Sequence, residues 1–170
     1  MLPILLKGDL VGFVQQLRGV CAHVIDDKPR LKVYEADGLT AKKSLPAFVA
    51  LPESISEVQG VVALCHREGV PVVARGAGTG LSGGAMPHPE GVLLSLAKFN
   101  RVLEIDVENR TARVEPGVTN LGISNAVRDL NLYYAPDPSS QMHHRWQYCG
   151  EFRGRALFKI RFNGEQCPGA

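Results

Sequence analysis

The sequence lacks any apolar run of the roughly 18 residues that a membrane-spanning helix needs. The segment from Met1 to Lys7 is only briefly apolar, no basic region precedes it, and Asp9 follows too soon for a signal peptide. The net charge is only +2, and 45% of the residues are hydrophobic, so disorder of the whole chain is excluded. These features predict a globular, cytoplasmic protein without a transmembrane segment, and 170 residues suffice for one domain with a true core.

Cysteine is also scarce, since the chain has four (Cys21, Cys65, Cys149 and Cys167) and none forms a C-x-x-C pair. Cys65 falls within a helical pattern, which predicts a small buried thiol and argues against a disulfide framework. His143-His144 together with Cys149 could suggest a metal site. No further ligand stands at a recognised spacing, so we expect no bound metal.

Most of the chain has no excess of charge of one sign, and such an excess appears only near its end. Residues 1–141 carry a net charge of −1, whereas residues 142–170 carry +3 and five of the eleven aromatic residues, including Trp146. A basic, aromatic segment is one mark of nucleic-acid binding. Because +3 is modest, we expect no nucleic-acid partner, and the change near residue 142 is consistent with a domain boundary, a tail or another kind of break.

Hydrophobic periodicity predicts helices and strands in alternation. Leu10 to Leu17 has helical spacing, and Phe48 to Leu51 is a short apolar strand. Ser54 and Glu57 form a capping box that opens a helix ended by Gly69. The apolar stripe of this helix comprises Ile55, Val58, Val61, Val62 and Cys65.

The second half predicts more strands than helices. The β-branched run Val70 to Ala74 is typical of a buried strand, and Gly91 to Ser95 of another. Residues 101–106 and 111–114 form a predicted hairpin. Thr119 caps a predicted helix through Leu130, with Leu121, Ile123, Ala126, Val127 and Leu130 as its apolar residues. The order of elements indicates an α+β fold of the α/β sandwich type.

The most informative stretch runs from Arg75 to Gly84 and contains five glycines. Glycine permits a positive φ and lets successive N–H groups approach an anion, so the loop is a candidate phosphate cradle. A plain surface loop is the alternative, but ordering so many glycines costs entropy. A Walker loop is excluded because no lysine lies between Lys43 and Lys98. The Rossmann pattern Gly78-x-Gly80-x-x-Gly83 is present, but the prolines at 87 and 89 prevent the helix that this fold requires.

Several separate motifs resemble the FAD-linked oxidases of the vanillyl-alcohol oxidase family, whose FAD-binding domain is called PCMH-type. Val70 to Gly84 resembles the family's pyrophosphate loop, and Tyr134 to Gln141 resembles its second flavin-contacting loop. Val49 to Glu53, Arg113 to Val118 and the Y-E-x-D-G motif at Tyr34 to Gly38 also agree. Within the family, the resemblance is strongest to the group formed by the FAD subunit of glycolate oxidase and the D-lactate dehydrogenases.

The resemblance implies FAD as cofactor and assigns residues to it. The pyrophosphate would be held by the first loop, that is by Arg75, Gly76, Ala77, Gly78, Thr79, Gly80, Ser82 and Gly83. The isoalloxazine or ribityl side would be lined by Pro136, Asp137, Pro138 and Ser139. For Arg75 two roles stay open, a phosphate ligand or an anchor of the loop. No residue is assigned to catalysis.

The implied reaction is hydride transfer from the α-carbon of a 2-hydroxy acid, glycolate or D-lactate, to flavin N5, giving the 2-keto acid. The implied partners of a complete enzyme are an iron–sulfur subunit and a second flavin-domain-like subunit. Such a complex can lie peripherally on the inner membrane face.

The resemblance stops after Gln141, where the family continues with I-G-G-N-x-A-E-N-x-G-G. Reading the codons one base later permits I-G-G-N-I-A-E-N-S-G-G here; Trp146 followed by Gln147, for example, forces GGC, a glycine codon. We therefore expect residues 142–170 to be a frameshifted, non-native tail.

The expected organisation is a helical lead-in (1–47), the N-terminal part of a PCMH-type domain (48–141) and this tail (142–170). We expect the chain by itself to be inactive. The alternative is a truncated remnant that binds little or no FAD.

Overall fold

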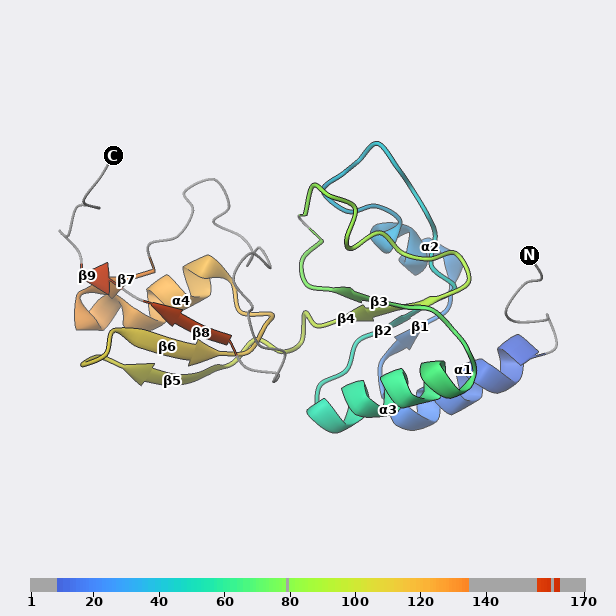
Figure 1. Ribbon diagram of the computed structural model, residues 1–170, viewed down its shortest axis with the longest axis horizontal. Coiled ribbons are helices and arrows are strands. Elements are labelled where there is room, and N and C mark those ends of the chain that lie inside the picture. Colours follow the sequence, from blue (N-terminus) through green and yellow to red (C-terminus); the bar gives the residue numbers. More distant parts are fainter. Residues whose placement is uncertain (1–8, 79, 135–155, 160, 163–170) are drawn as a thin grey trace. The chain divides into compact units, whose positions relative to one another are not determined.

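The computed structural model describes residues 9–78, 80–134, 156–159 and 161–162, which form two units, Met1–Lys98 and Phe99–Ala170 (Figure 1). Each unit contains helices and its own sheet, so the predicted α+β class is confirmed. Within the described residues, no helix has both the length and the apolar character needed to cross a membrane.

The first unit is built on a four-stranded sheet of order β1-β2-β4-β3. Its strands are β1 (Val24–Ile25), β2 (Phe48–Ala50), β3 (Val72–Arg75) and β4 (Val92–Ser95). β2 and β3 both run parallel to β4, with Phe48 and Val72 level with Val92, while β1 is antiparallel to β2. β4 lies between two strands, and all four of its residues are buried.

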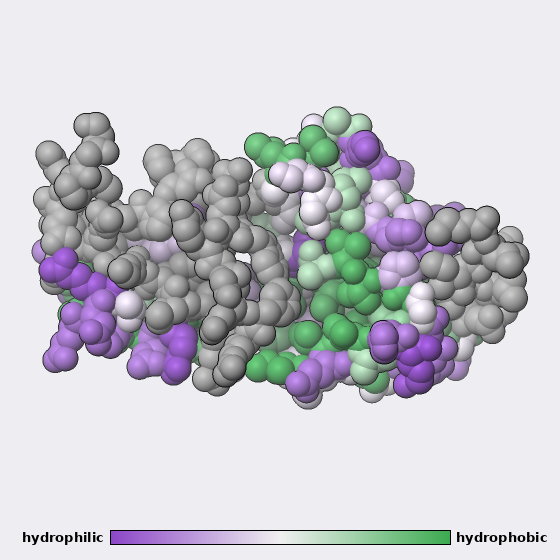
Figure 2. Space-filling view, viewed as in Figure 1, coloured by the Kyte–Doolittle hydropathy of each residue, from purple (hydrophilic) through white to green (hydrophobic). Residues whose placement is uncertain are grey.

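The strand that we predicted to be buried, Val70 to Ala74, differs from that expectation. β3 begins two residues later, and Val72 to Ala74 are only partly buried. The reason is its place at the end of the described sheet, where it has one neighbouring strand. Figure 2 shows hydrophobic surface over the sheet of this unit, which is where such a strand leaves apolar side chains accessible.

Helices cover both faces of this sheet. The long helices α1 (Asp9–Val20) and α3 (Ile55–Arg67) lie side by side below it, and α2 (Lys28–Leu31) lies above, followed by the 3-10 turn η1 (Lys32–Tyr34) (Figure 1). A Cβ added at Gly60 of α3 would lie 3.1 Å from the Cβ of Val20, so glycine permits the close approach of the two helices. Leu31 of α2 packs with Val49 and Leu93 on the sheet.

The predicted start and end of α3 are confirmed. Ser54 accepts a hydrogen bond from the N–H of Glu57 (3.2 Å), and Gly69 ends the helix with a φ of +66°. The apolar stripe is only partly right. Val61 and Cys65 are buried, but Ile55 and Val62 are half-exposed, and Leu64 takes the core position instead.

The second unit pairs a hairpin with a helix. β5 (Val102–Asp106) and β6 (Thr111–Val114) are antiparallel, which confirms the predicted hairpin. Its turn includes Arg110 at a φ of +53°. β6 also pairs with β8 (Ala156–Lys159), and β7 (Leu132–Tyr133) pairs with β9 (Arg161–Phe162). The two short strands β8 and β9 fall within residues 142–170.

The helix of this unit, α4 (Asn120–Val127), begins as predicted and ends earlier. Thr119 accepts a hydrogen bond from the N–H of Gly122 (2.9 Å), and the chain continues after Val127 as the 3-10 turn η2 (Arg128–Leu130). Ile123 and Val127 join the core, which also includes Ala112, Val114, Val118 and Leu132. The predicted apolar positions Leu121, Ala126 and Leu130 are exposed, because only one side of this short helix meets the sheet.

Candidate functional site

The glycine-rich loop joins β3 to β4 across residues 76–91. Because these strands are parallel, the chain cannot turn back in a tight hairpin and must cross from one end of the sheet to the other. The described residues of this crossover form bends and turns and no helix, with the N–H of Met86 donating to the carbonyl of Gly83 (3.2 Å). The prediction that no Rossmann helix follows Gly83 is therefore confirmed.

Two of the described glycines in this loop are required by their backbone conformation, whereas two others leave open space beside the backbone. Gly78 and Gly83 have φ values of +73° and +75°, which L side chains rarely adopt. At Gly80 and Gly84, by contrast, an added Cβ would meet nothing within 4 Å. The loop therefore packs against the protein at 78 and 83 and leaves backbone accessible at 80 and 84.

The carbonyl groups that hold Arg75 come from a distant part of the chain. Its Nη1 donates to the carbonyl of Ala36 (2.8 Å) and to that of Tyr34 (3.3 Å), and its Cζ lies 5.7 Å from the centre of the Tyr34 ring. The side chain is buried, which lowers the pKa of the guanidinium, while the charge of Asp37 opposes this shift. Of the two roles left open for Arg75, these hydrogen bonds support the anchor.

The described site residues fall into one loop. Gly76, Ala77, Gly78, Gly80, Ser82 and Gly83 follow Arg75 within the crossover, and Ser82 is exposed. Thr79 and the second predicted group, Pro136, Asp137, Pro138 and Ser139, lie outside the described residues. Sequence reasoning missed Asp37, which is only 5% exposed. The Y-E-A-D-G motif marked this segment in the sequence, but no function was assigned to its residues.

The chemistry of the loop suits an anion of the size of a diphosphate. Its donors are backbone N–H groups and the hydroxyl of Ser82, and glycine leaves room beside them. No aspartate or glutamate stands between Glu68 and Glu90, so no carboxylate of the loop itself repels phosphate. Among the described residues, no group of three His, Cys, Asp or Glu side chains is placed to hold a metal ion.

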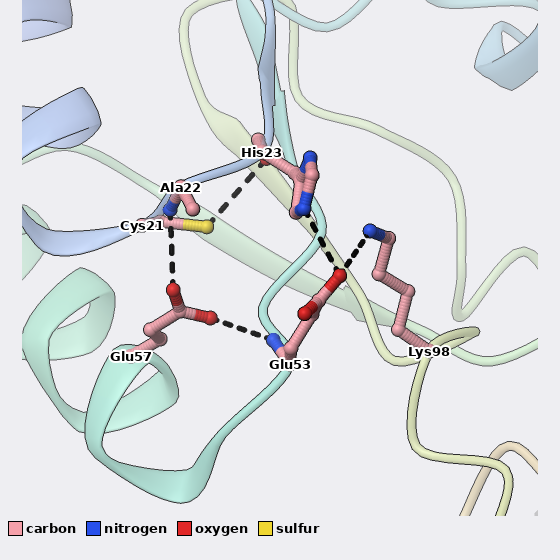
Figure 3. Close-up of polar contacts among 6 residues, drawn as sticks. All are labelled: Cys21, Ala22, His23, Glu53, Glu57 and Lys98. Carbon is pink, nitrogen blue, oxygen red and sulfur yellow. Dashed lines mark hydrogen bonds and ion pairs between the residues drawn. The ribbon is translucent and has the colours of Figure 1, made fainter.

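A second polar cluster lies in the same unit, where the residues before β1, the residues before α3 and Lys98 come together (Figure 3). Glu53 forms ion pairs with His23 (3.0 Å from Nε2) and with Lys98, and the hydrogen bond from Lys98 lowers the pKa of its carboxyl. Both Glu53 and His23 are about half-exposed. The cluster holds no activated nucleophile, because burial raises the pKa of the neighbouring Cys21 thiol. Its groups bind one another, and we assign it to structure.

The chain thus has an α+β domain in which a glycine-rich loop without lysine or helix connects two parallel strands, and the family match assigns this domain to the flavin-binding class. The chain belongs to the family described as "FAD binding domain", whose model matches residues 46–143. FAD is the cofactor of this family.

Among curated proteins, the chain is 58% identical to the glycolate oxidase subunit GlcD of Escherichia coli (strain K12) over 109 residues. These residues are 64% of this chain and 22% of that protein. It is 36% identical over 108 residues to a D-lactate dehydrogenase of Archaeoglobus fulgidus, covering 63% of this chain and 24% of that protein. The chain thus spans less than a quarter of the length of these relatives.

The fold is shared with a solved structure of p-cresol methylhydroxylase with substrate bound. The two superpose with a TM-score of 0.64 at 24% identity, covering 75% of this chain and 26% of that one. The predicted PCMH-type fold is therefore confirmed for the N-terminal part of the domain.

Proposed function

We propose that residues 76–80, together with Ser82 and Gly83, bind the diphosphate of FAD through backbone N–H groups and the Ser82 hydroxyl. The observation that carries this proposal is the loop itself, with its open backbone at Gly80 and Gly84 and no carboxylate. We propose further that Pro136, Asp137, Pro138 and Ser139 line the flavin or ribityl part of the same cofactor.

The reaction that we propose for the complete enzyme is oxidation of a 2-hydroxy acid, glycolate or D-lactate, to the 2-keto acid. Support comes from the names of the relatives, a glycolate oxidase subunit and a D-lactate dehydrogenase. The bound flavin supplies the hydride acceptor, and the protein contributes binding and orientation. We assign no catalytic residue within this chain. An iron–sulfur subunit and a second flavin-domain-like subunit are proposed partners, and the proposed location is the cytoplasm.

We also propose the domain organisation that the sequence predicts. It comprises a lead-in (1–47), the partial FAD-binding domain (48–141) and a tail read in another frame (142–170). The family match supports the second boundary because it ends at residue 143. Sequencing the gene across the codon for Met142 tests the frame, and an error-free reading that never recovers G-G-N would overturn it.

FAD binding is tested by equilibrium titration of the purified chain with FAD, followed by flavin absorbance. Gly80→Asp places a carboxylate on the open side of the loop and is expected to abolish whatever FAD binding the 170-residue chain shows. Gly12→Asp is the matched control, since Gly12 is exposed on α1 and a Cβ there also meets nothing within 4 Å. Equal affinity in both variants would contradict the assignment of the loop.

Activity is tested by dye reduction with glycolate or D-lactate. For the 170-residue chain we expect weak or no retention of FAD and no turnover, which is also what the alternative of a non-catalytic truncated remnant requires. Stoichiometric FAD with turnover would overturn both the frameshift and the remnant.

A further inference from the structure

The segment Tyr34 to Leu39, which precedes the matched domain, contacts the glycine-rich loop at two points. At one end of the loop, the buried Arg75 donates hydrogen bonds to the carbonyls of Tyr34 and Ala36. At the other end, a Cβ added at Gly83 would lie 3.7 Å from Cδ2 of Leu39. The segment therefore supports the loop at both of its left-handed glycines.

The contact between Arg75 and Gly78 is the tightest in the loop. A Cβ at Gly78 would lie closer to Cζ, Nη2 and Nε of Arg75 than real Cβ atoms come. The backbone of Gly78 thus rests directly on the guanidinium. A guanidinium at the end of a flexible side chain normally moves aside, but this one is buried and held by two carbonyls.

Asp37 is a buried carboxylate whose charge opposes the effect of burial on the pKa of Arg75. Asp37 is 5% exposed, its charge acts on Arg75, and its Oδ1 accepts a hydrogen bond from the N–H of Leu39 (2.9 Å). Its Oδ2 has no hydrogen-bond partner among the described residues. Because the guanidinium is buried and its Nη1 donates to two carbonyls, Arg75 contributes through its shape and its hydrogen bonds.

We propose that Arg75 is a positioning residue that connects the segment Tyr34–Leu39 to the loop, and not a ligand of the diphosphate. Through this connection the segment Tyr34–Leu39 supports the FAD site indirectly. A change in the backbone of the segment moves the guanidinium of Arg75, and Gly78 rests on that guanidinium. This inference rests on the proposed role of the loop as the diphosphate site.

The test uses the 170-residue chain and measures hydrogen exchange of peptides covering residues 34–39, without FAD. Gly78→Ala is expected to displace the guanidinium and raise the exchange rate in this segment by about tenfold or more. Gly69→Ala is the matched control, because Gly69 has a similar left-handed φ (+66°) while its Cβ meets nothing within 4 Å, and it is expected to leave the exchange of residues 34–39 unchanged. Unchanged exchange in a folded Gly78→Ala variant overturns the proposal.

A second readout separates positioning from phosphate binding. Arg75→Lys keeps the positive charge but loses the planar group that reaches both carbonyls. We expect it to weaken FAD binding about as much as Arg75→Gln does, with no change in the salt dependence of the affinity. Rescue by lysine, or a reduced salt dependence in Arg75→Gln, would show a direct phosphate contact and overturn the proposal.

A double substitution completes the test. In an Arg75→Ala background the Cβ at residue 78 has no guanidinium to meet, so Gly78→Ala is expected to cost less FAD affinity there than in the original chain. Additive losses would overturn the proposal. FAD affinity that Gly80→Asp leaves unchanged, together with faster exchange in Gly78→Ala, would instead overturn the proposed function and support the connection.

Discussion

One carboxylate, that of Glu57, joins three backbone segments of the first unit. It accepts hydrogen bonds from the N–H of Glu53 (2.6 Å) and from the N–H of Ala22 (3.2 Å), at the first turn of α3 (Figure 3). The first of these bonds is the main reason that the pKa of Glu57 lies below its ordinary value. The predicted capping box is confirmed in the bond that Ser54 accepts from the N–H of Glu57, whereas the Glu57 carboxylate accepts from Glu53 and also holds the chain entering β1.

Glu57→Gln is expected to lower the free energy of unfolding by about 1–2 kcal/mol at pH 7, because an amide accepts with one oxygen only. A lowered carboxyl pKa stabilises the fold above the unfolded pKa and loses this contribution as the pH falls through the folded value. The difference between the variant and the original chain should therefore shrink below about pH 4. Urea unfolding at pH 7 and pH 3.5 measures it, and an equal difference at both would contradict an ionised acceptor.

The thiol of Cys65 is expected to be inert in the folded chain. It is fully buried, and burial raises its pKa to about 11, so at pH 8 about one thiol in a thousand is ionised. Iodoacetamide at pH 8 should leave the Cys65 peptide unmodified in native buffer and modify it fully in denaturant, as measured by mass spectrometry. Rapid modification in native buffer would show that α3 opens.

At the scale of elements, β4 is the strand on which the first unit depends. Leu93 is fully buried and packs with Leu31 of α2 and Val49 of β2. Leu93→Ala should cost about 2–5 kcal/mol of unfolding free energy, since it removes buried methyl groups and leaves a cavity. Val62→Ala is the control, because Val62 of α3 is 46% exposed, and should cost less than about 1 kcal/mol. Similar losses in urea unfolding would contradict this description of the core.

The buried glutamate at the end of β6 holds the hairpin of the second unit closed. Glu115 accepts hydrogen bonds from the backbone N–H of Arg101 (2.9 Å) and from its guanidinium (2.7 Å from Nη2). Burial raises the pKa of Glu115, but the bonds from Arg101 outweigh it and leave the pKa below its usual value. Glu115→Ala should cost about 1–3 kcal/mol in thermal or urea unfolding, and Arg101→Ala less, because the backbone bond remains. An equal loss in both would contradict the role given to the backbone contact.

Sequence reasoning located elements better than it located contacts. Capping residues and turn glycines are local signals, so the start of α3, the hairpin and the loop at 76–84 were all predicted. Burial depends on what packs against an element, so Ile55, Val62 and Leu121 were wrongly placed in apolar stripes. The contact of Arg75 with Tyr34 and Ala36 joins residues about forty positions apart, and no spacing within the sequence predicts such a pair.

At the scale of the whole molecule, the charge distribution and the family match divide the chain at nearly the same place. The match ends at residue 143, and the basic, aromatic segment starts at residue 142. The small positive net charge comes entirely from that segment, since residues 1–141 carry −1. It is therefore no evidence for an acidic partner of the FAD-binding part.

If residues 142–170 belong to another reading frame, restoring the frame should restore cofactor binding. Deleting one base at the codon for Met142 lets the gene encode I-G-G-N-I-A-E-N-S-G-G, a sequence that the family places in a further flavin loop. We expect the purified product to retain more FAD per chain than the 170-residue protein, measured by flavin absorbance after gel filtration. The control is the same deletion combined with Gly80→Asp. This variant should again lose the flavin, because the frame-restored product still depends on the glycine-rich loop to bind the diphosphate. Equal FAD content before and after the deletion would show that the segment from residue 142 onward is not what limits binding, and the frameshift would lose its functional support.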